Sequence, residues 1–242
     1  MRLDKFICKS TELTRSEAKK LLKSGEVRVN GDVAKNPAMQ VHENNNIKID
    51  GQTLTARGSR YFMLHKVADT ICSNVDEGYP SVLNFVDVDK AFDLHIAGRL
   101  DADTTGLVLI TDDGRWSHNV ISPKKECQKI YRVWLRTPIT VEKSIALIEQ
   151  FSQGIQLQGE SSLTKPAILT LVTDTDVDNE VLLMITEGRY HQVKRMFAAV
   201  GNRVVGLHRE QIGALKLADL APGKWRSLKE DEVTLFLSLI HI

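Results

Sequence analysis

Residues 98–110 read GRLDADTTGLVLI, a loop of small and polar side chains that runs directly into an apolar segment. The loop combines two acids, an arginine, two threonines and two glycines. Glycine permits unusual backbone paths, and threonine hydroxyls can bond the backbone of the turn. The pattern predicts a loop that holds a carboxylate at the floor of a cleft, with a capped tight turn as the simpler alternative. Its spacing matches neither of the glycine-rich phosphate-binding motifs.

The two acids of this loop, Asp101 and Asp103, invite a metal-binding interpretation. No nearby histidine or third acid completes such a site, so we expect no metal. Leu100 can anchor the loop in the core, which leaves Asp101 facing the cleft. Asp103 stands beside two hydroxyls and is expected to bond the backbone amides of the turn.

A second polar segment, residues 187–197, reads EGRYHQVKRMF. The segment is expected to leave a strand, turn at Gly188 and form a helix over 190–200. Spacing places His191, Lys194 and Arg195 on one face of that helix. Cations near a helix start oppose the macrodipole, so a phosphate backbone or a buried carboxylate is expected to favour them there. The alternative is a group of exposed cations.

A third segment, residues 129–134, reads KIYRVW and alternates as a strand does. Alternation places Tyr131 on the core side with Val133 and Leu135. Such a tyrosine is either an ordinary core residue or a platform on which an RNA base stacks.

The N-terminal 60 residues differ in charge from the rest of the chain. They carry 12 basic and 7 acidic side chains, a net charge of +5, within a chain whose net charge is +1. We expect helices over 2–9 and 15–23, the second with a capping box at 14–17 and a terminating Gly25. Strands are expected over 27–29 and 47–49. A basic module of this size is typical of polyanion binding, and a solvated lysine-rich face is the alternative.

Beyond a predicted linker at 55–60 the chain is rich in strands. We expect strands over 61–64, 107–111, 130–135, 167–172, 181–186, 203–207 and 232–237. A further helix is expected to begin at Thr140 and end at Gly154. Because strands and helices do not alternate regularly, the fold class is α+β, with a mixed, mainly antiparallel sheet and flanking helices.

Composition excludes several protein classes. Of the 242 residues, 42% are hydrophobic and 26% are charged, as in folded globular domains. No apolar run is long enough to predict a membrane span, and the N-terminus lacks the apolar core of a secretory signal. The three cysteines form no CxxC pair, so a reducing cytoplasm is expected.

These segments together resemble the ribosomal small-subunit pseudouridine synthase A (RsuA-like) family over about the whole chain. Residues 1–58 resemble an S4 RNA-binding domain through LTRSEAK at 13–19 and VRVNG at 27–31. Residues 98–107, 187–196 and 207–213 (LHREQIG) resemble motifs of the catalytic domain. One departure is that the family's Lys-Pro-x-Gly element reads Lys66-Val67-Ala68-Asp69 here.

The resemblance implies a role for individual residues. Asp101 would be the catalytic aspartate, Tyr131 would stack on the target base, and Lys194 would pair with the aspartate, with Arg195 as the competing partner. Ile212 or Leu215 would pack near the base. Arg99 and Arg189 would hold RNA phosphates or the loop. The full set of residues expected to bind RNA or substrate also includes Arg195, Arg209, Arg15, Lys19, Lys20 and Lys23.

The resemblance also implies two domains, 1–58 of S4 type and 59–237 with the pseudouridine synthase fold, followed by a tail at 238–242. The expected reaction is isomerisation of uridine to pseudouridine in small-subunit (16S) ribosomal RNA by base flipping, without cofactor or metal. The expected partner is ribosomal RNA, free or partly assembled with proteins, and the expected state is a monomer without membrane contact.

Two alternatives stand beside this interpretation. The first is a non-catalytic RNA-binding or ribosome assembly protein, which the altered 66–69 element favours and the intact Asp101, Tyr131 and Lys194 oppose. The second is a small-molecule hydrolase that uses Asp101 and Asp103 as an acid/base pair, for which a basic N-terminal module has no use.

Overall fold

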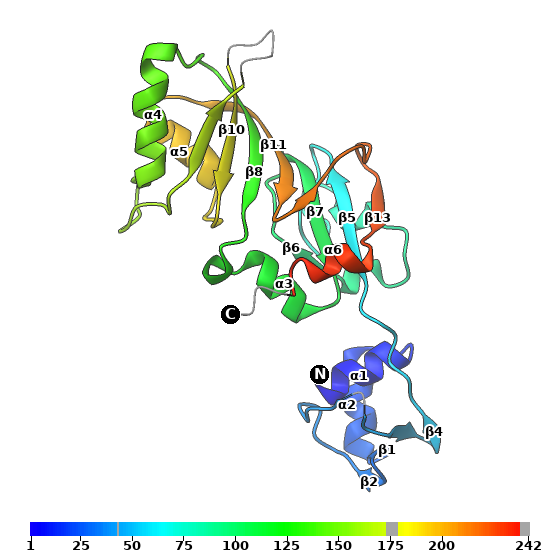
Figure 1. The fold of residues 1–242 in the computed structure, drawn as a ribbon. Helices are drawn as coiled ribbons and strands as arrows, with labels where there is room; N and C mark the ends of the chain where they lie inside the picture. The colour runs from blue at the N-terminus through cyan, green and yellow to red at the C-terminus, as the bar shows by residue number, and fades with distance from the viewer. Residues whose placement is uncertain (43, 173–178, 238–242) are drawn as a thin grey trace. The chain divides into compact units, whose positions relative to one another are not determined.

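The computed structural model describes residues 1–42, 44–172 and 179–237, so the expected tail at 238–242 lies outside the described residues. The chain divides into two compact units, Met1–Ser59 and Arg60–Ile242. Each unit is described by itself, and Figure 1 shows the elements of both.

The first unit combines two helices with a small antiparallel sheet of strand order β2-β1-β3-β4. Its elements are α1 (Leu3–Ser10), α2 (Arg15–Ser24), β1 (Val27–Val29), β2 (Asp32–Val33), β3 (Ile47–Ile49) and β4 (Gln52–Thr53). Buried apolar side chains from both helices and from β1 and β3 form its core. The helices and strands predicted for this part of the chain are confirmed.

Local sequence signals account for these elements. Thr14 and Glu17 form the predicted capping box, in which the Thr14 hydroxyl accepts from the Glu17 amide and the Glu17 carboxylate accepts from the Thr14 amide. Gly25 ends the helix in the left-handed conformation, with a φ of 85°. Asn30 and Gly31 both have positive φ, which is the geometry of a tight hairpin turn between β1 and β2.

The second unit is built on a larger sheet with helices around it. Its strands are β5 (Tyr61–Lys66), β6 (His95–Ala97), β7 (Thr105–Thr111), β8 (Lys129–Leu135), β9 (Ile168–Leu171), β10 (Glu180–Ile185), β11 (Val204–Ile212), β12 (Leu215–Lys216) and β13 (Trp225–Ser227). Its helices are α3 (Gly114–Ile121), α4 (Val141–Gln153), α5 (Gln192–Ala199) and α6 (Glu230–Thr234), with 3-10 turns η1 (Val82–Phe85), η2 (Ala91–Asp93) and η3 (Pro123–Lys125).

The described strands of this unit form one sheet in the order β13-β5-β7-β11-β8-β10-β9, with β6 on β7 and β12 on β11. All pairs are antiparallel except β7 and β11, which run parallel. This pair joins two halves of the sheet (Figure 1). The predicted mixed, mainly antiparallel α+β fold is confirmed.

Helices cover the two halves separately. Figure 1 shows α4 and α5 beside β8 and β10, while α3 and α6 lie by β5 and β7. The α4 and α5 helices meet through Phe151 and Phe197, whose ring centroids are 5.1 Å apart. Near α3 and α6, Trp116 packs on Phe236 with ring centroids 5.0 Å apart. Two cores stabilise this unit: the one that contains Phe151 and Phe197 extends onto one face of β5 and β7, and the one that contains Trp116 and Phe236 packs on the other face of those strands.

The strand predicted over 232–237 is wrong, because this segment begins inside helix α6. The Glu232 carboxylate accepts from the Lys229 amide at 2.8 Å and pairs with Arg226 at 2.7 Å, which fixes the first turn. Trp116 then donates its indole N–H to the carbonyl of Val233. These partners are distant in sequence or lie outside the alternating pattern that suggested a strand. The helix expected over 190–200 is present but begins two residues later, at Gln192.

Candidate active site

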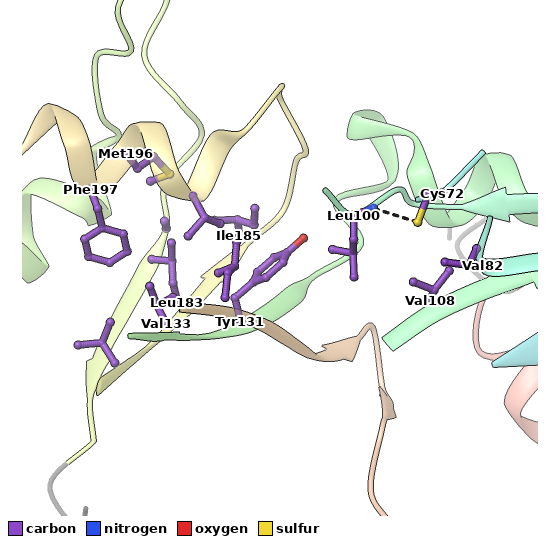
Figure 2. Packing of buried hydrophobic residues seen from close by; sticks show 14 of the residues in the cluster. Cys72, Val82, Leu100, Val108, Tyr131, Val133, Leu183, Ile185, Met196 and Phe197 are labelled. Atoms are coloured by element: carbon purple, nitrogen blue, oxygen red, sulfur yellow. Dashed lines mark hydrogen bonds between the residues drawn. The ribbon is translucent and has the colours of Figure 1, made fainter. Parts of the chain in front are cut away.

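The Asp101 loop, residues 98–104, connects β6 to β7 and is fastened at several points. The Leu100 amide donates to the buried thiol of Cys72 at 3.3 Å (Figure 2). The Lys66 ammonium, which is only 1% exposed, donates to the carbonyls of Ala102 and Thr104 at 3.1 and 2.7 Å. These bonds hold the backbone on both sides of Asp101.

The altered 66–69 element also supports this loop. The Asp69 amide donates to the Ala102 carbonyl at 3.0 Å. Asp69 has a φ of 59°, so it adopts the left-handed conformation at the position where the family pattern has glycine. Aspartate tolerates this region better than most residues do. The turn therefore keeps its contact with the Asp101 loop without glycine.

Gly106, the last residue of the motif at 98–106, is required by a close approach of two strands. Its φ is 109°, and a Cβ atom there would lie 2.3 Å from the backbone oxygen of Arg209. Backbone atoms at that distance cannot move aside without breaking the parallel pairing of β7 with β11. The glycine therefore sets the junction from which the Asp101 loop projects.

Helix α5 and the residue just before it bring Lys194 and His191 to the loop. Lys194 Nζ lies 3.1 Å from Asp101 Oδ2 and 2.7 Å from Asp103 Oδ1, so one ammonium bridges two carboxylates. His191 Nε2 lies 3.3 Å from the other oxygen of Asp101. The Asp101 side chain is 32% exposed, whereas that of Asp103 is 72% exposed. Asp101 is thus the more enclosed acid.

The charges of this cluster stabilise one another. Burial alone would lower the pKa of Lys194, but hydrogen bonds to Asp103 and Asp101 outweigh it and the pKa is raised. Burial alone would raise the pKa of Asp103, but Lys194 outweighs it and the pKa is lowered. Asp103 was expected to bond backbone amides of the turn; a backbone hydrogen bond is present, but the carboxylate also accepts two hydrogen bonds from Lys194, which the sequence did not predict.

Arg195, the competing candidate for the partner of Asp101, points elsewhere. Its guanidinium pairs with Glu160 at 3.0 Å and donates to the carbonyls of Tyr190 and Gln158. Lys194 is therefore the helix α5 cation that contacts Asp101, and Arg195 fastens the helix to the segment around 158–160.

Tyr131 is 7% exposed and lies in the main core cluster, with its hydroxyl directed toward Leu100 (Figure 2). Behind it is Arg209, which is 1% exposed and donates to the Tyr131 hydroxyl, the Leu107 carbonyl and the Gly98 carbonyl. Arg209 was expected to bind RNA, but its N–H groups donate to acceptors within the protein instead. It positions Tyr131 and ties the start of the Asp101 loop to the sheet.

A cavity of about 700 Å³ opens at this place. It lies between the Asp101 loop, strand β8 and the start of helix α5. Its lining includes Asp101, Tyr131, Lys194, Arg99, Lys129 and His191. The three segments that the sequence singled out thus meet around one cavity.

Other predicted residues lie outside the reactive cluster. Arg189 donates to the carbonyls of Ser162 and Leu163 and to Glu187, so these bonds fasten the segment around 162–163 and not the Asp101 loop. Ile212 and Leu215 are buried in the second core with Trp116, and neither is among the described residues that line the cavity, contrary to expectation. Arg99 lines the cavity and is exposed.

The basic residues of helix α2 lie in the first unit, which is described separately. All four are exposed: Arg15, Lys19, Lys20 and Lys23. Arg15 also lies 3.8 Å from the buried carboxylate of Asp4.

Lys66 and His191 are among the residues near Asp101 for which the sequence predicted no role. Lys66 lay in a motif that was noted only for its departure from the family pattern, and its burial could not be inferred from an alternating strand. His191 was placed on the polar helix face, but without a partner. It adopts a φ of 47° just before helix α5, which brings its ring to Asp101.

Within residues 1–42, 44–172 and 179–237, no group of three or more His, Cys, Asp or Glu side chains could hold a metal ion. No helix in the same ranges has the length and apolar character needed to cross a membrane.

Known protein families match most of this chain. A family model described as RNA pseudouridylate synthase matches residues 60–199, and the S4 domain model matches residues 1–47. The ribosomal small subunit pseudouridine synthase A of Vibrio cholerae is 52% identical over 96% of this chain and 98% of its own. The protein of the same name from Escherichia coli is 49% identical over the same shares.

A solved structure of a pseudouridylate synthase is also similar, with a TM-score of 0.68 and 46% sequence identity over 98% of this chain and 99% of that chain. The matches span both units and include the Asp101 loop. The chain belongs to the RNA pseudouridylate synthase family and carries an S4 domain at its N-terminus.

Proposed function

We propose that this enzyme isomerises uridine to pseudouridine in small-subunit ribosomal RNA, with Asp101 as the catalytic carboxylate. The names of the Vibrio cholerae and Escherichia coli relatives support the substrate class. The observation that carries the catalytic assignment is the Asp101–Lys194 pair, 3.1 Å apart, in the wall of a cavity that Tyr131 also lines.

The reaction needs a carboxylate but no group donor. The N1–C1′ bond breaks and its electron pair leaves with the base, the base turns, and C5 bonds to C1′. C5 then loses its proton and N1 gains one, so the net change is an isomerisation. Asp101 can attack C1′, assist departure of the base or add to C6. In each route the adjacent ammonium of Lys194 can hold the carboxylate in place by a charge-assisted hydrogen bond.

The cavity favours a target base that leaves its stack. Within a helix the glycosidic bond is shielded from protein side chains, so enzymes acting on it extrude the nucleotide. Tyr131 offers an aromatic surface on which an extruded base can stack. Arg209 supports this role, because its bond to the Tyr131 hydroxyl at 3.3 Å fixes the ring.

The N-terminal unit, residues 1–58 in this proposal, contributes RNA affinity rather than chemistry. Its support is the exposed basic face of helix α2, since exposed cations contact phosphates without distinguishing sequence. Arg99, which is exposed at the cavity, is proposed to contact a phosphate of the target strand.

The test compares two neighbouring acids. Asp101→Asn removes the nucleophile and the charge but keeps the shape, so it should abolish tritium release from ribosomal RNA that carries 5-tritiated uridine. Asp103→Asn is the matched control, because it removes the more exposed partner of Lys194 and leaves the Asp101–Lys194 contact. It should retain substantial activity. Multiple turnovers by Asp101→Asn would falsify the assignment.

A further inference from the structure

Two lysines are buried in the second unit, and they differ in how their ammonium groups are satisfied. Lys66 donates to three backbone carbonyls, those of Val67, Ala102 and Thr104. Lys129 is 6% exposed and donates to one, the carbonyl of Cys127 at 3.0 Å. An ammonium carries three N–H donors, and burial without acceptors is costly. Among the described residues, Lys129 therefore has donors to spare where Lys66 has none.

Lys129 lies at the cavity, where its remaining N–H donors can meet a bound substrate. Lys129 and Tyr131 alternate on the same face of strand β8, and both line the cavity that contains Asp101. Two other cations that line the cavity, Lys194 and Arg209, are already engaged. Lys194 is held by two carboxylates, and Arg209 by the Tyr131 hydroxyl and two carbonyls.

Depth distinguishes the part of a nucleotide that can reach Lys129. Phosphates are joined to the neighbouring nucleotides, so they stay with the strand outside the cavity, where the exposed Arg99 is suited to contact them. A base that has left its stack is the part that can insert. Its acceptors are the carbonyl oxygens O2 and O4.

We propose that Lys129 donates to a carbonyl oxygen of the target uracil and stabilises the negative charge on the base while it is detached from C1′. The inference rests on the proposed function. When the N1–C1′ bond breaks, its electron pair spreads over the ring onto O2 and O4, so charge develops at the atoms that Lys129 would contact. The charge disappears when C5 bonds to C1′ and the C5 proton is replaced by one on N1.

Such a donor acts in the transition state more than in RNA binding. Removing one preorganised donor that is aimed at developing charge lowers kcat by roughly 10²–10³-fold. Burial lowers the pKa of Lys129, and a neighbouring anionic base opposes that effect because it favours the charged ammonium.

The experiment uses the leaving ability of the base as its readout. Small-subunit ribosomal RNA is transcribed with either uridine or 5-fluorouridine, because fluorine withdraws electrons and stabilises the detached base by itself. The single-turnover rate of conversion to a C-glycoside is followed by nucleoside mass spectrometry for the full-length enzyme. Lys129→Met should slow the uridine reaction roughly 10²-fold or more. The fold-loss of rate with 5-fluorouridine RNA should be at least ten times smaller than the fold-loss with uridine RNA.

Controls separate this role from a structural one. Lys124→Met removes an exposed cation nearby and should leave both rates unchanged. Lys129→Arg should recover much of the rate, because it restores a cation. If Lys129→Met fails to fold by its melting curve, Lys129→Gln replaces it and the same comparison of substrates applies.

The outcomes are distinct. Equal losses with both RNAs, or no loss with either, would overturn the proposal. A loss of RNA affinity with a salt slope smaller by about 1 would instead make Lys129 a phosphate contact and overturn it as well. If the unchanged enzyme forms no pseudouridine in this RNA, the proposed function itself fails, whatever the variants do.

Discussion

Replacing Lys194 with methionine tests whether this cation supports the reacting carboxylate or merely touches RNA. Methionine keeps the length and packing of the side chain and removes the charge. It leaves Asp101 and Asp103 as like charges in one loop with no ammonium between them, where Lys194 had bridged both at 3.1 and 2.7 Å. The carboxylate of Asp101 then loses its hydrogen bond to the Lys194 ammonium.

The size of the effect follows from the geometry. Unit charges 3.1 Å apart attract by about 1 kcal/mol at the dielectric constant of water and about 5 kcal/mol at an effective value of 20. The two side chains are 26% and 32% exposed, which places the site between these limits, at roughly 2–3 kcal/mol. A loss of that size in the transition state lowers kcat by about 30- to 150-fold.

The assay is single-turnover tritium release at saturating RNA, with RNA affinity measured separately by filter binding. Lys194→Met should lose rate and keep affinity within a few-fold. Arg195→Met is the matched control on the same helix, because Arg195 pairs with Glu160 and not with either aspartate. It should keep most of the rate. A Lys194→Met enzyme within threefold of the wild-type rate, or an Arg195→Met enzyme that is the slower of the two, would refute the reasoning.

Three further predictions concern stability and RNA binding. Asp69→Ala should lower the free energy of unfolding by about 1 kcal/mol because alanine is strained at a φ of 59°, whereas Asp69→Gly should not; equal losses in urea melts would show that the carboxylate matters instead. Replacing all four exposed cations of helix α2 by glutamine should weaken RNA binding and flatten its salt dependence without changing kcat at saturation, and an unchanged slope would exclude phosphate contacts there. The Arg226 hydrogen bond lowers the pKa of Glu232 from 4.5 to about 2, so the stabilisation is present above pH 4.5 and is lost as pH falls toward 2. Thermal melts should therefore show Glu232→Gln less stable than the wild type at pH 6 by roughly 1–2 kcal/mol, with the gap closing by pH 2 to 3; a constant gap would contradict the linkage.

Local signals predicted the fold wherever one short segment contains all the interactions that decide its structure. The capping box of Thr14 and Glu17 and the hairpin turn at Asn30 and Gly31 are complete within a few residues, and both form as expected. The segment 232–237 fails this condition. Its alternating apolar residues resemble a strand, but Arg226 and the indole of Trp116 bind it as a helix, and Trp116 is more than a hundred residues away.

The candidate site shows a sharper limit, which concerns where a cation points. From the sequence, RNA or the Asp101 carboxylate was an equally plausible partner for each of four cations, because each is a positive charge in a motif: Lys194, Arg195, Arg189 and Arg209. Their targets differ because backbone carbonyls compete with phosphates for N–H donors, and that competition is decided only when distant segments pack.

The burial of each cation decides whether its N–H groups bond protein acceptors or RNA, and composition does not predict that burial. Arg209 is 1% exposed and must find acceptors inside the protein, so it takes a hydroxyl and two carbonyls and becomes a support for Tyr131. Lys194 remains partly exposed and meets carboxylates. Burying a cation costs free energy when its N–H donors outnumber the protein acceptors around it. Such a cation therefore points to a function, because an acceptor on a bound substrate would offset that cost. Lys129 is in that position, and the charge that develops on a departing uracil is the kind of acceptor that would compensate it.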